Sequence, residues 1–147
     1  MPPQSTHAAD YRSLSDFRYE IRRFLNFSES AARQAGLEAQ QHQALLAIAG
    51  LPPHQRPTVG VLAERLQVRH HSAVELVNRL AQKRLIRRAA AEADRRTVIL
   101  QLTARGEKIL RQVTLPHLEE LQTAGRNLLR TLAAVMRGAG KNRKGRS

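Results

Sequence analysis

Residues 58–102 contain the pattern that most restricts the fold of this chain: two short amphipathic helices, a break between them, and an alternating apolar run. Thr58 is a predicted N-cap, and the helix after it carries the apolar residues Val61, Leu62, Ala63 and Leu66. A second helix, from about His70 to Arg84, turns inward the apolar residues Ala73, Leu76, Val77 and Leu80. Gln67 lies in the break, where such turns often use glycine, so the turn is expected to be strained or differently shaped. Two short helices joined in this way form a helix-turn-helix.

A β-hairpin is predicted directly after the second helix. Residues 85–88 read as one strand, and Val98, Leu100 and Leu102 alternate along another. The segment between them, AAEADRR, is polar. The hairpin therefore has a charged tip and follows the helix-turn-helix without an intervening element.

Helical periodicity also flanks this segment on both sides. Apolar residues between Leu14 and Leu25 repeat at helical spacing, and Gly36 suits the end of that helix. A second helix is expected over residues 37–49. After the hairpin, Thr103 is expected to cap a further helix, and Pro116 to start or kink a last long one. The expected fold class is mainly α with a small β-hairpin.

Positive charge is concentrated in the middle of the chain and at its C-terminal end. The 147 residues include 25 Lys and Arg against 12 Asp and Glu, a formal net charge of +13. Residues 56–105 carry eleven basic and four acidic side chains, residues 137–147 carry five basic and no acidic ones, and residues 1–55 are neutral overall. Such a bias favours polyanionic partners, nucleic acid first. The alternative is a solvated basic surface.

The chain lacks the residues that several functional classes of protein need. The chain has no cysteine, which excludes disulfides, thiol switches and Cys-type zinc sites. His70 and His71 are adjacent and diverge by about 100° on a helix, so no metal site is predicted. No catalytic pattern or glycine-rich phosphate loop is present, so we expect neither an enzyme nor a cofactor.

The chain also lacks membrane signals. No apolar stretch approaches the ~20 residues that span a bilayer, and the N-terminal segment MPPQSTHAAD does not read as a signal peptide. A soluble, cytoplasmic protein is expected.

Across residues 10–136 the order of elements resembles the MarR family of bacterial transcription regulators. Asp94, Arg96, Leu102 and Thr103 match the family's pattern of D-x-R, five residues, and L-T. The segments LAERLQV and VNRLAQKRLI match the two helices and the entry to the wing. The resemblance implies a winged-helix DNA-binding homodimer in which the first and last helices of the two subunits intertwine.

The resemblance also divides the chain into functional parts. Residues 1–9 are expected to form a flexible arm, residues 10–137 a single MarR-like domain, and residues 138–147 a basic disordered tail. The parts of the domain are dimerisation helices at residues 10–50 and 115–137 and a winged helix-turn-helix lobe at residues 51–114.

The second helix of the helix-turn-helix is expected to read DNA. Its outer face bears the candidate DNA-binding residues His70, His71, Ser72, Val74, Glu75, Asn78 and Arg79. Asn78 can pair bidentately with adenine, Glu75 can accept from cytosine, and Val74 can touch a thymine methyl group. His70, Ser72 and Arg79 suit phosphate. Two roles stay open for Glu75, base selection or an ion pair with Arg79, its i+4 neighbour.

The hairpin tip supplies the remaining candidates, Asp94, Arg95 and Arg96. In a winged helix this tip lies in the minor groove, where a narrow groove attracts arginine. Asp94 is expected to pair with an arginine and brace the tip, because phosphate would repel it. The preferred assignment has Arg95 toward DNA and Arg96 held by Asp94, although the two arginines can exchange roles. The alternative is an exposed ion pair without a partner, which contributes only ~0–1 kcal/mol.

The expected function is sequence-specific transcription regulation by a homodimer that binds a palindromic operator. Repression is favoured over activation. The resemblance allows a small-molecule effector pocket lined by aromatic residues, although plain interface core is the more frequent role of such residues: Tyr11, Phe17, Tyr19, Phe24 and Phe27. Two alternatives are an architectural DNA-binding protein with weak sequence preference and a winged-helix module for protein contacts.

Overall fold

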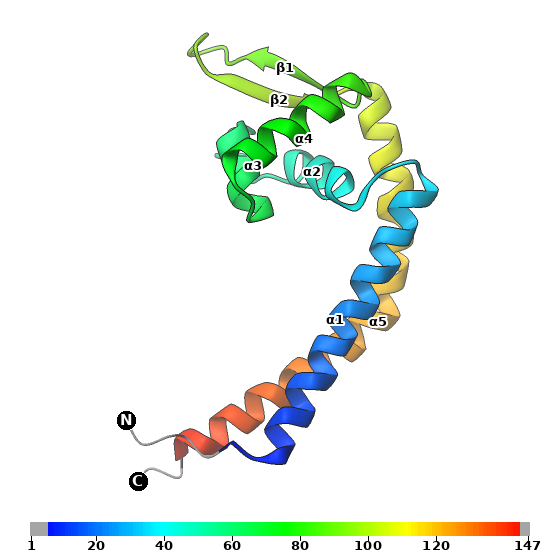
Figure 1. Ribbon diagram of the computed structural model, residues 1–147, viewed down its shortest axis with the longest axis vertical. Coiled ribbons are helices and arrows are strands. Elements are labelled where there is room, and N and C mark those ends of the chain that lie inside the picture. Colours follow the sequence, from blue (N-terminus) through cyan, green and yellow to red (C-terminus); the bar gives the residue numbers. More distant parts are fainter. Residues whose placement is uncertain (1–5, 145–147) are drawn as a thin grey trace. The chain divides into compact units, whose positions relative to one another are not determined.

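The computed structural model describes residues 6–144, which form helices and one β-hairpin (Figure 1). The elements in chain order are α1 (Ala8–Gln34), α2 (Ala39–Ala49), α3 (Val59–Leu66), α4 (His70–Gln82), β1 (Ile86–Ala90), β2 (Val98–Leu102) and α5 (Ala104–Lys144). They divide into two compact units. The winged unit is Ala31–Leu115, and the helical unit comprises the residues up to Ser30 together with those from Pro116 onward. The expected fold class, mainly α with a hairpin wing, is confirmed.

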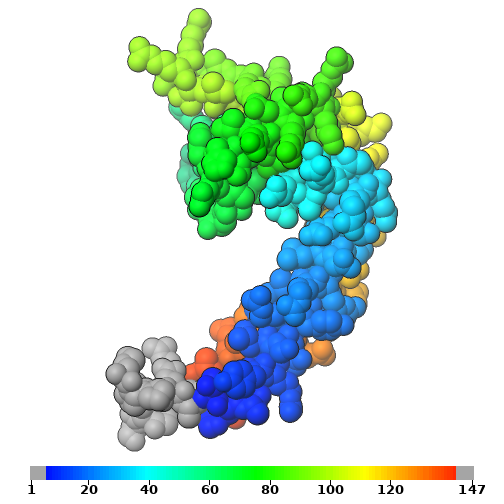
Figure 2. All heavy atoms as spheres, viewed as in Figure 1, coloured from blue at the N-terminus to red at the C-terminus, as the bar shows by residue number. Residues whose placement is uncertain are grey.

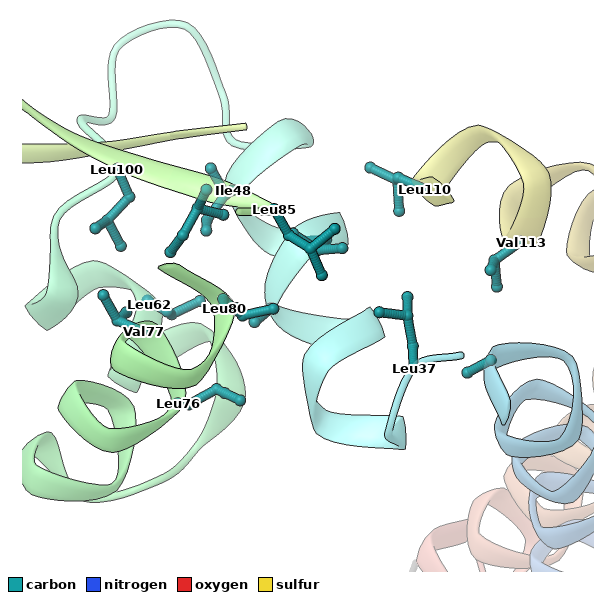
Figure 3. Close-up of a cluster of buried hydrophobic side chains, with 14 residues drawn as sticks. Leu37, Ile48, Leu62, Leu76, Val77, Leu80, Leu85, Leu100, Leu110 and Val113 are labelled. Carbon is teal, nitrogen blue, oxygen red and sulfur yellow. The ribbon is translucent and has the colours of Figure 1, made fainter. Parts of the chain in front are cut away.

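A hydrophobic core holds the winged unit together (Figure 3). Its large side chains at most 1% exposed come from α2, α4, the segment entering β1, β2 and α5: Leu45, Val77, Leu80, Leu85, Leu100 and Val113. Burial of each such side chain stabilises the fold by about 1.5–3 kcal/mol. Helix α4 and the hairpin therefore pack against the same buried side chains.

Helices α3 and α4 form the predicted helix-turn-helix. Thr58 caps α3, because its Oγ1 accepts a hydrogen bond from the Val61 amide at 3.2 Å. Gln67 ends the helix with φ of 54°, in the left-handed region that favours glycine, so the expected strain is present. Its side-chain Nε2 donates to the Glu64 carbonyl at 2.7 Å, which partly offsets that cost. Ala63 on α3 is buried as well.

The hairpin is longer than predicted and begins one residue later. Strands β1 and β2 are antiparallel, with Ile86 opposite Leu102 and Ala90 opposite Val98. Leu85, which we expected to start the strand, instead donates its amide to the Leu80 carbonyl at 3.0 Å and closes the end of α4.

The start of helix α5 is tied to the entry of the hairpin. Thr103 caps the helix as predicted, since its Oγ1 accepts from the Gly106 amide at 3.0 Å. The same hydroxyl donates to the Arg84 carbonyl at 2.6 Å, and the Thr103 amide donates to the Leu85 carbonyl at 3.0 Å. Gly106 passes so close to this backbone that a Cβ there would lie 2.0 Å from the Leu85 carbonyl oxygen.

The ends of the chain are more helical than the sequence predicted. Helix α1 begins at Ala8, inside the expected arm, and residues 1–5 lie outside the described residues. Helix α5 continues through Pro116, so no new helix starts there, and it continues through residues 138–144 of the expected disordered tail. No proline interrupts that stretch, and basic residues near a helix C-terminus are favoured by the helix dipole. Residues 145–147 lie outside the described part of the chain.

Helix α2 belongs to the winged unit, whereas the sequence grouped residues 10–50 with the dimerisation helices. The physical reason is its packing, because Leu45 and Ile48 are buried in the same core as α4 and β2. Gln41 is also buried, and its Oε1 accepts from the Lys83 side chain at 3.1 Å. The assignment of residues 10–50 and 115–137 to dimerisation stays a prediction.

The helical unit consists of the N-terminal part of α1 and the C-terminal part of α5 (Figure 1). His117 and Ser28 join the two helices, with 2.6 Å between Nε2 and Oγ. The Phe24 and Phe27 rings meet the His117 ring edge to face, at centroid distances of 6.0 Å and 5.7 Å. Across residues 6–144, no helix is both long and apolar enough to cross a membrane.

Candidate nucleic-acid interface

Helix α4 presents the side chains that we expect to face DNA. The apolar residues predicted to point inward are all buried: Ala73, Leu76, Val77 and Leu80. His70, His71, Glu75, Asn78 and Arg79 are exposed, and Ser72 and Val74 are partly buried. His71, Glu75 and Asn78 follow one another at three- and four-residue spacing, so they form a single polar stripe along the helix. Contact between this stripe and DNA stays a prediction.

The surface formed by α4 and the hairpin is strongly basic. Residues 69–96 carry eight basic and three acidic side chains, a net charge of +5. All eight basic side chains are exposed: Arg69, Arg79, Lys83, Arg84, Arg87, Arg88, Arg95 and Arg96. The hairpin side chains project from the surface of the winged unit beside α4 (Figure 2). A concentration of exposed cations on a helix and an adjoining hairpin is typical of a surface that meets phosphate.

Asn78 is bound by an arginine of the hairpin. The Arg88 Nη2 donates a hydrogen bond to the Asn78 Oδ1. Arg88 is paired across the hairpin with Leu100, which is buried, so its side chain starts on the core-facing side of β1. Arg88 was not among the residues predicted from the sequence to bind DNA. Arg88 lies two residues after Ile86, and alternate residues of a strand share a face. This spacing could have indicated that Arg88 points toward the same side as Ile86.

Arg79 is paired with an acid outside helix α4. Its Nη1 lies 4.0 Å from the Glu38 Oε2, just before α2. Among the described residues no ion pair joins Arg79 to Glu75, so the i+4 pair that we considered is not formed. Glu38 also takes part in the capping box of α2 with Gln41. Since both charged groups are exposed, the Arg79–Glu38 pair contributes little to stability.

Asp94 braces the hairpin tip through the backbone rather than through an arginine side chain. Its Oδ1 accepts from the Arg96 amide at 3.0 Å, and its Oδ2 accepts from the Thr97 hydroxyl at 3.1 Å. The expected pairing of Asp94 with a guanidinium is therefore wrong. A short aspartate side chain reaches the amide two residues later, which is the geometry of an Asx turn. Arg95 and Arg96 both remain exposed, so their relative roles stay a prediction.

The described residues contain two cavities of interest, one in each unit. A cavity of about 370 Å³ in the helical unit is lined partly by Phe24 and Phe27. A cavity of about 790 Å³ in the winged unit lies among α2, the hairpin and the start of α5, and Arg87, Gln101 and Arg111 line it. The Gln101 Oε1 is buried and has no hydrogen-bond partner among the described residues. Tyr11 and Tyr19, expected among the pocket or interface aromatics, are 64% and 55% exposed.

Comparison with known proteins identifies the family that this fold resembles. Residues 35–97 match the model of the MarR family. Comparison with curated proteins finds no match.

Solved structures share the fold over most of the chain. AbsC, a MarR family transcriptional regulator from Streptomyces coelicolor, is 18% identical, with coverage of 97% of this chain and 99% of that chain and a TM-score of 0.72. A mutant of S. aureus MepR bound to an oligodeoxyribonucleotide is 23% identical, with coverage of 73% and 77% and a TM-score of 0.61. BpsR from Bordetella bronchiseptica, whose DNA binding is regulated by 6-hydroxynicotinic acid, is 19% identical, with coverage of 73% and 74% and a TM-score of 0.55. These likenesses confirm the winged-helix fold.

Proposed function

Because residues 35–97 match the MarR family model and the chain shares the fold of MarR family regulators, we propose that this protein is a sequence-specific DNA-binding transcription regulator. The observation that carries the proposal is the joint surface of α4 and the hairpin, with its eight exposed basic side chains and the polar stripe of the recognition helix. In helix-turn-helix proteins the second helix enters the major groove. The basic hairpin then meets the adjoining backbone and minor groove.

The protein acts as a homodimer on a palindromic operator. In the helical unit several large apolar side chains are 38–70% exposed, which is unfavourable in water over a continuous surface. A second copy of the chain covers these side chains. A two-fold dimer presents two recognition helices to half-sites about one helical turn apart, so the operator repeats the symmetry of the protein.

Selection of bound fragments from the source genome tests this function. We expect a palindromic sequence to be enriched and to bind at least about 10³-fold more tightly than random DNA at the same salt concentration. Equal affinity for all sequences would support the architectural alternative, which the basic C-terminal end of the chain favours. Absence of DNA binding even at low salt would support a module for protein contacts.

We further propose that the protein is a repressor and that a small molecule releases it from the operator. The cavity in the winged unit borders the hairpin, and its lining includes two guanidinium groups and the unpaired Gln101 Oε1. A ligand there would contact the hairpin and the start of α5 together, so its binding would alter the position of the wing. Small metabolites made or degraded by products of the genes next to the operator are the compounds to test. An effector should lower operator affinity, and Gln101→Leu should reduce that response without changing affinity in its absence.

A further inference from the structure

The hydrogen bond between Arg88 and Asn78 fixes the orientation of the Asn78 amide. A guanidinium has only N–H donors, so the atom that it binds must be the amide oxygen and not the amide nitrogen. The Asn78 Oδ1 therefore faces Arg88 on strand β1. The Asn78 Nδ2, with its two N–H groups, is left to meet DNA.

This orientation changes what Asn78 can recognise. Bidentate pairing with adenine needs the amide oxygen to accept from the adenine N6 amino group while the amide nitrogen donates to N7. Here a cationic donor occupies one of the two lone pairs of the oxygen, and the guanidinium stands beside the other. An approaching N6 amino group would have to share the oxygen with this cation. Asn78 and Arg88 together present mainly hydrogen-bond donors.

We infer that the Arg88–Asn78 pair selects guanine rather than adenine at one position of each operator half-site, which makes Arg88 a specificity-determining residue. Guanine is the base with two adjacent acceptors, N7 and O6, on its major-groove edge. Adenine N7 and thymine O4 offer one acceptor each. The inference rests on the proposed function, because it requires α4 to lie in the major groove.

The hairpin provides a matched control in Arg87. Arg87 is also exposed and carries the same charge, but it is paired across the hairpin with Gln101, on the other face from Arg88. Among the described residues no hydrogen bond joins Arg87 to Asn78. Loss of either arginine removes one positive charge next to DNA, whereas only loss of Arg88 frees the Asn78 oxygen.

The experiment measures dissociation constants for operators that carry each of the four bases at every half-site position. Asn78→Ala first locates the position, as the one where base preference becomes flat. At that position the wild type should prefer guanine over adenine by roughly 5- to 150-fold. Arg88→Ala should transfer the preference to adenine, and Arg88→Lys, which keeps a cationic donor, should retain guanine. Arg87→Ala should weaken binding to all four operators equally.

Three results would overturn the inference. They are a wild-type preference for adenine at that position, an Arg88→Ala variant that keeps the wild-type preference as Arg87→Ala does, and an Asn78→Ala variant that changes no position. In each case an operator is still bound selectively, so the proposed function survives. If no operator is bound selectively by the wild type, both the function and the inference fail. Unfolding curves of the exposed-site variants exclude loss of structure as the cause.

Discussion

Gly106 lies where the first turn of α5 passes over the backbone that leads into the hairpin. Any Cβ at this position would lie 2.0 Å from the Leu85 carbonyl oxygen, and backbone cannot move aside as a flexible side chain can. That carbonyl also accepts from the Thr103 amide. Because glycine has no side chain, Gly106 permits the close junction between the hairpin and helix α5.

Gly106→Ala should lower the free energy of unfolding by about 1–3 kcal/mol or more, because overpacking outweighs the gain in helix propensity. Denaturant unfolding at constant protein concentration measures the change. Gly140→Ala is the control, because Gly140 lies in the same helix and a Cβ there meets nothing within 4 Å. This variant should unfold like the wild type or slightly later. Equal curves for both variants would show that the close approach does not exist in solution.

The Asp94 carboxylate holds the hairpin tip through two hydrogen bonds and makes no contact that requires an arginine side chain. Asp94→Ala should therefore leave the fold intact and weaken operator binding, since a looser tip places its arginines less well. Binding titrations and thermal unfolding measure the two effects. Glu92→Ala removes the same charge from the same segment, so it should bind as well as the wild type or more tightly. If Asp94→Ala also gains affinity, charge rather than bracing decides its effect.

At the scale of elements, the sequence predicted the features that depend on residues close together in the chain. The inward residues of α4, the caps at Thr58 and Thr103, and the hairpin follow from spacing and side-chain type. The long α5 did not, because Pro116 is a strong helix-ending signal that the rest of the helix overrides. Within the candidate site, the exposed stripe was predictable from the 3.6-residue period. The Arg88–Asn78 and Arg79–Glu38 contacts were not, since they join elements that meet only after folding.

The recognition helix and the wing should respond differently to mutation. Arg95→Ala should weaken operator binding mainly through the flanking base pairs, and its effect should be larger when A·T tracts lie there, because they narrow the minor groove. Titrations on operators with exchanged flanks measure this, and Arg96→Ala on the same operators shows which arginine enters the groove. If neither variant depends on the flanks, the tip does not lie in the minor groove.

At the scale of the whole molecule, helix α5 carries an apolar stripe on a side that does not face α1. Its members are 38–70% exposed and follow at intervals of three, eight, three and four residues, which keeps them on one side of the helix: Leu118, Leu121, Leu129, Leu132 and Met136. His117 and Thr131, which face elsewhere on the helix, are 9% exposed. Helix α1 adds exposed apolar residues of its own, Tyr11, Leu14 and Leu25. Among the described residues of the helical unit no apolar side chain is buried, so neither helix is fully covered within one chain.

Leu129→Glu tests whether a second copy covers this stripe. Leu129 is 70% exposed in a single chain, so a charge there would be harmless to a monomer. In a dimer it would be buried without a partner, at a cost of about 3–5 kcal/mol, and would act twice because of the two-fold symmetry. Light scattering after size exclusion should therefore show a dimer for the wild type and dissociation or aggregation for Leu129→Glu. Arg130→Glu, outside the stripe, should remain dimeric.

Deletion of residues 1–30 tests the same interface from the other helix. Loss of most of α1 uncovers further apolar surface on α5, so we expect aggregated or unfolded protein. A well-folded, monodisperse monomer from this deletion would contradict the dimer, and so would a Leu129→Glu variant with the mass of the wild type. Since a palindrome needs two recognition helices held together, either result would also remove the physical reason for expecting a palindromic operator.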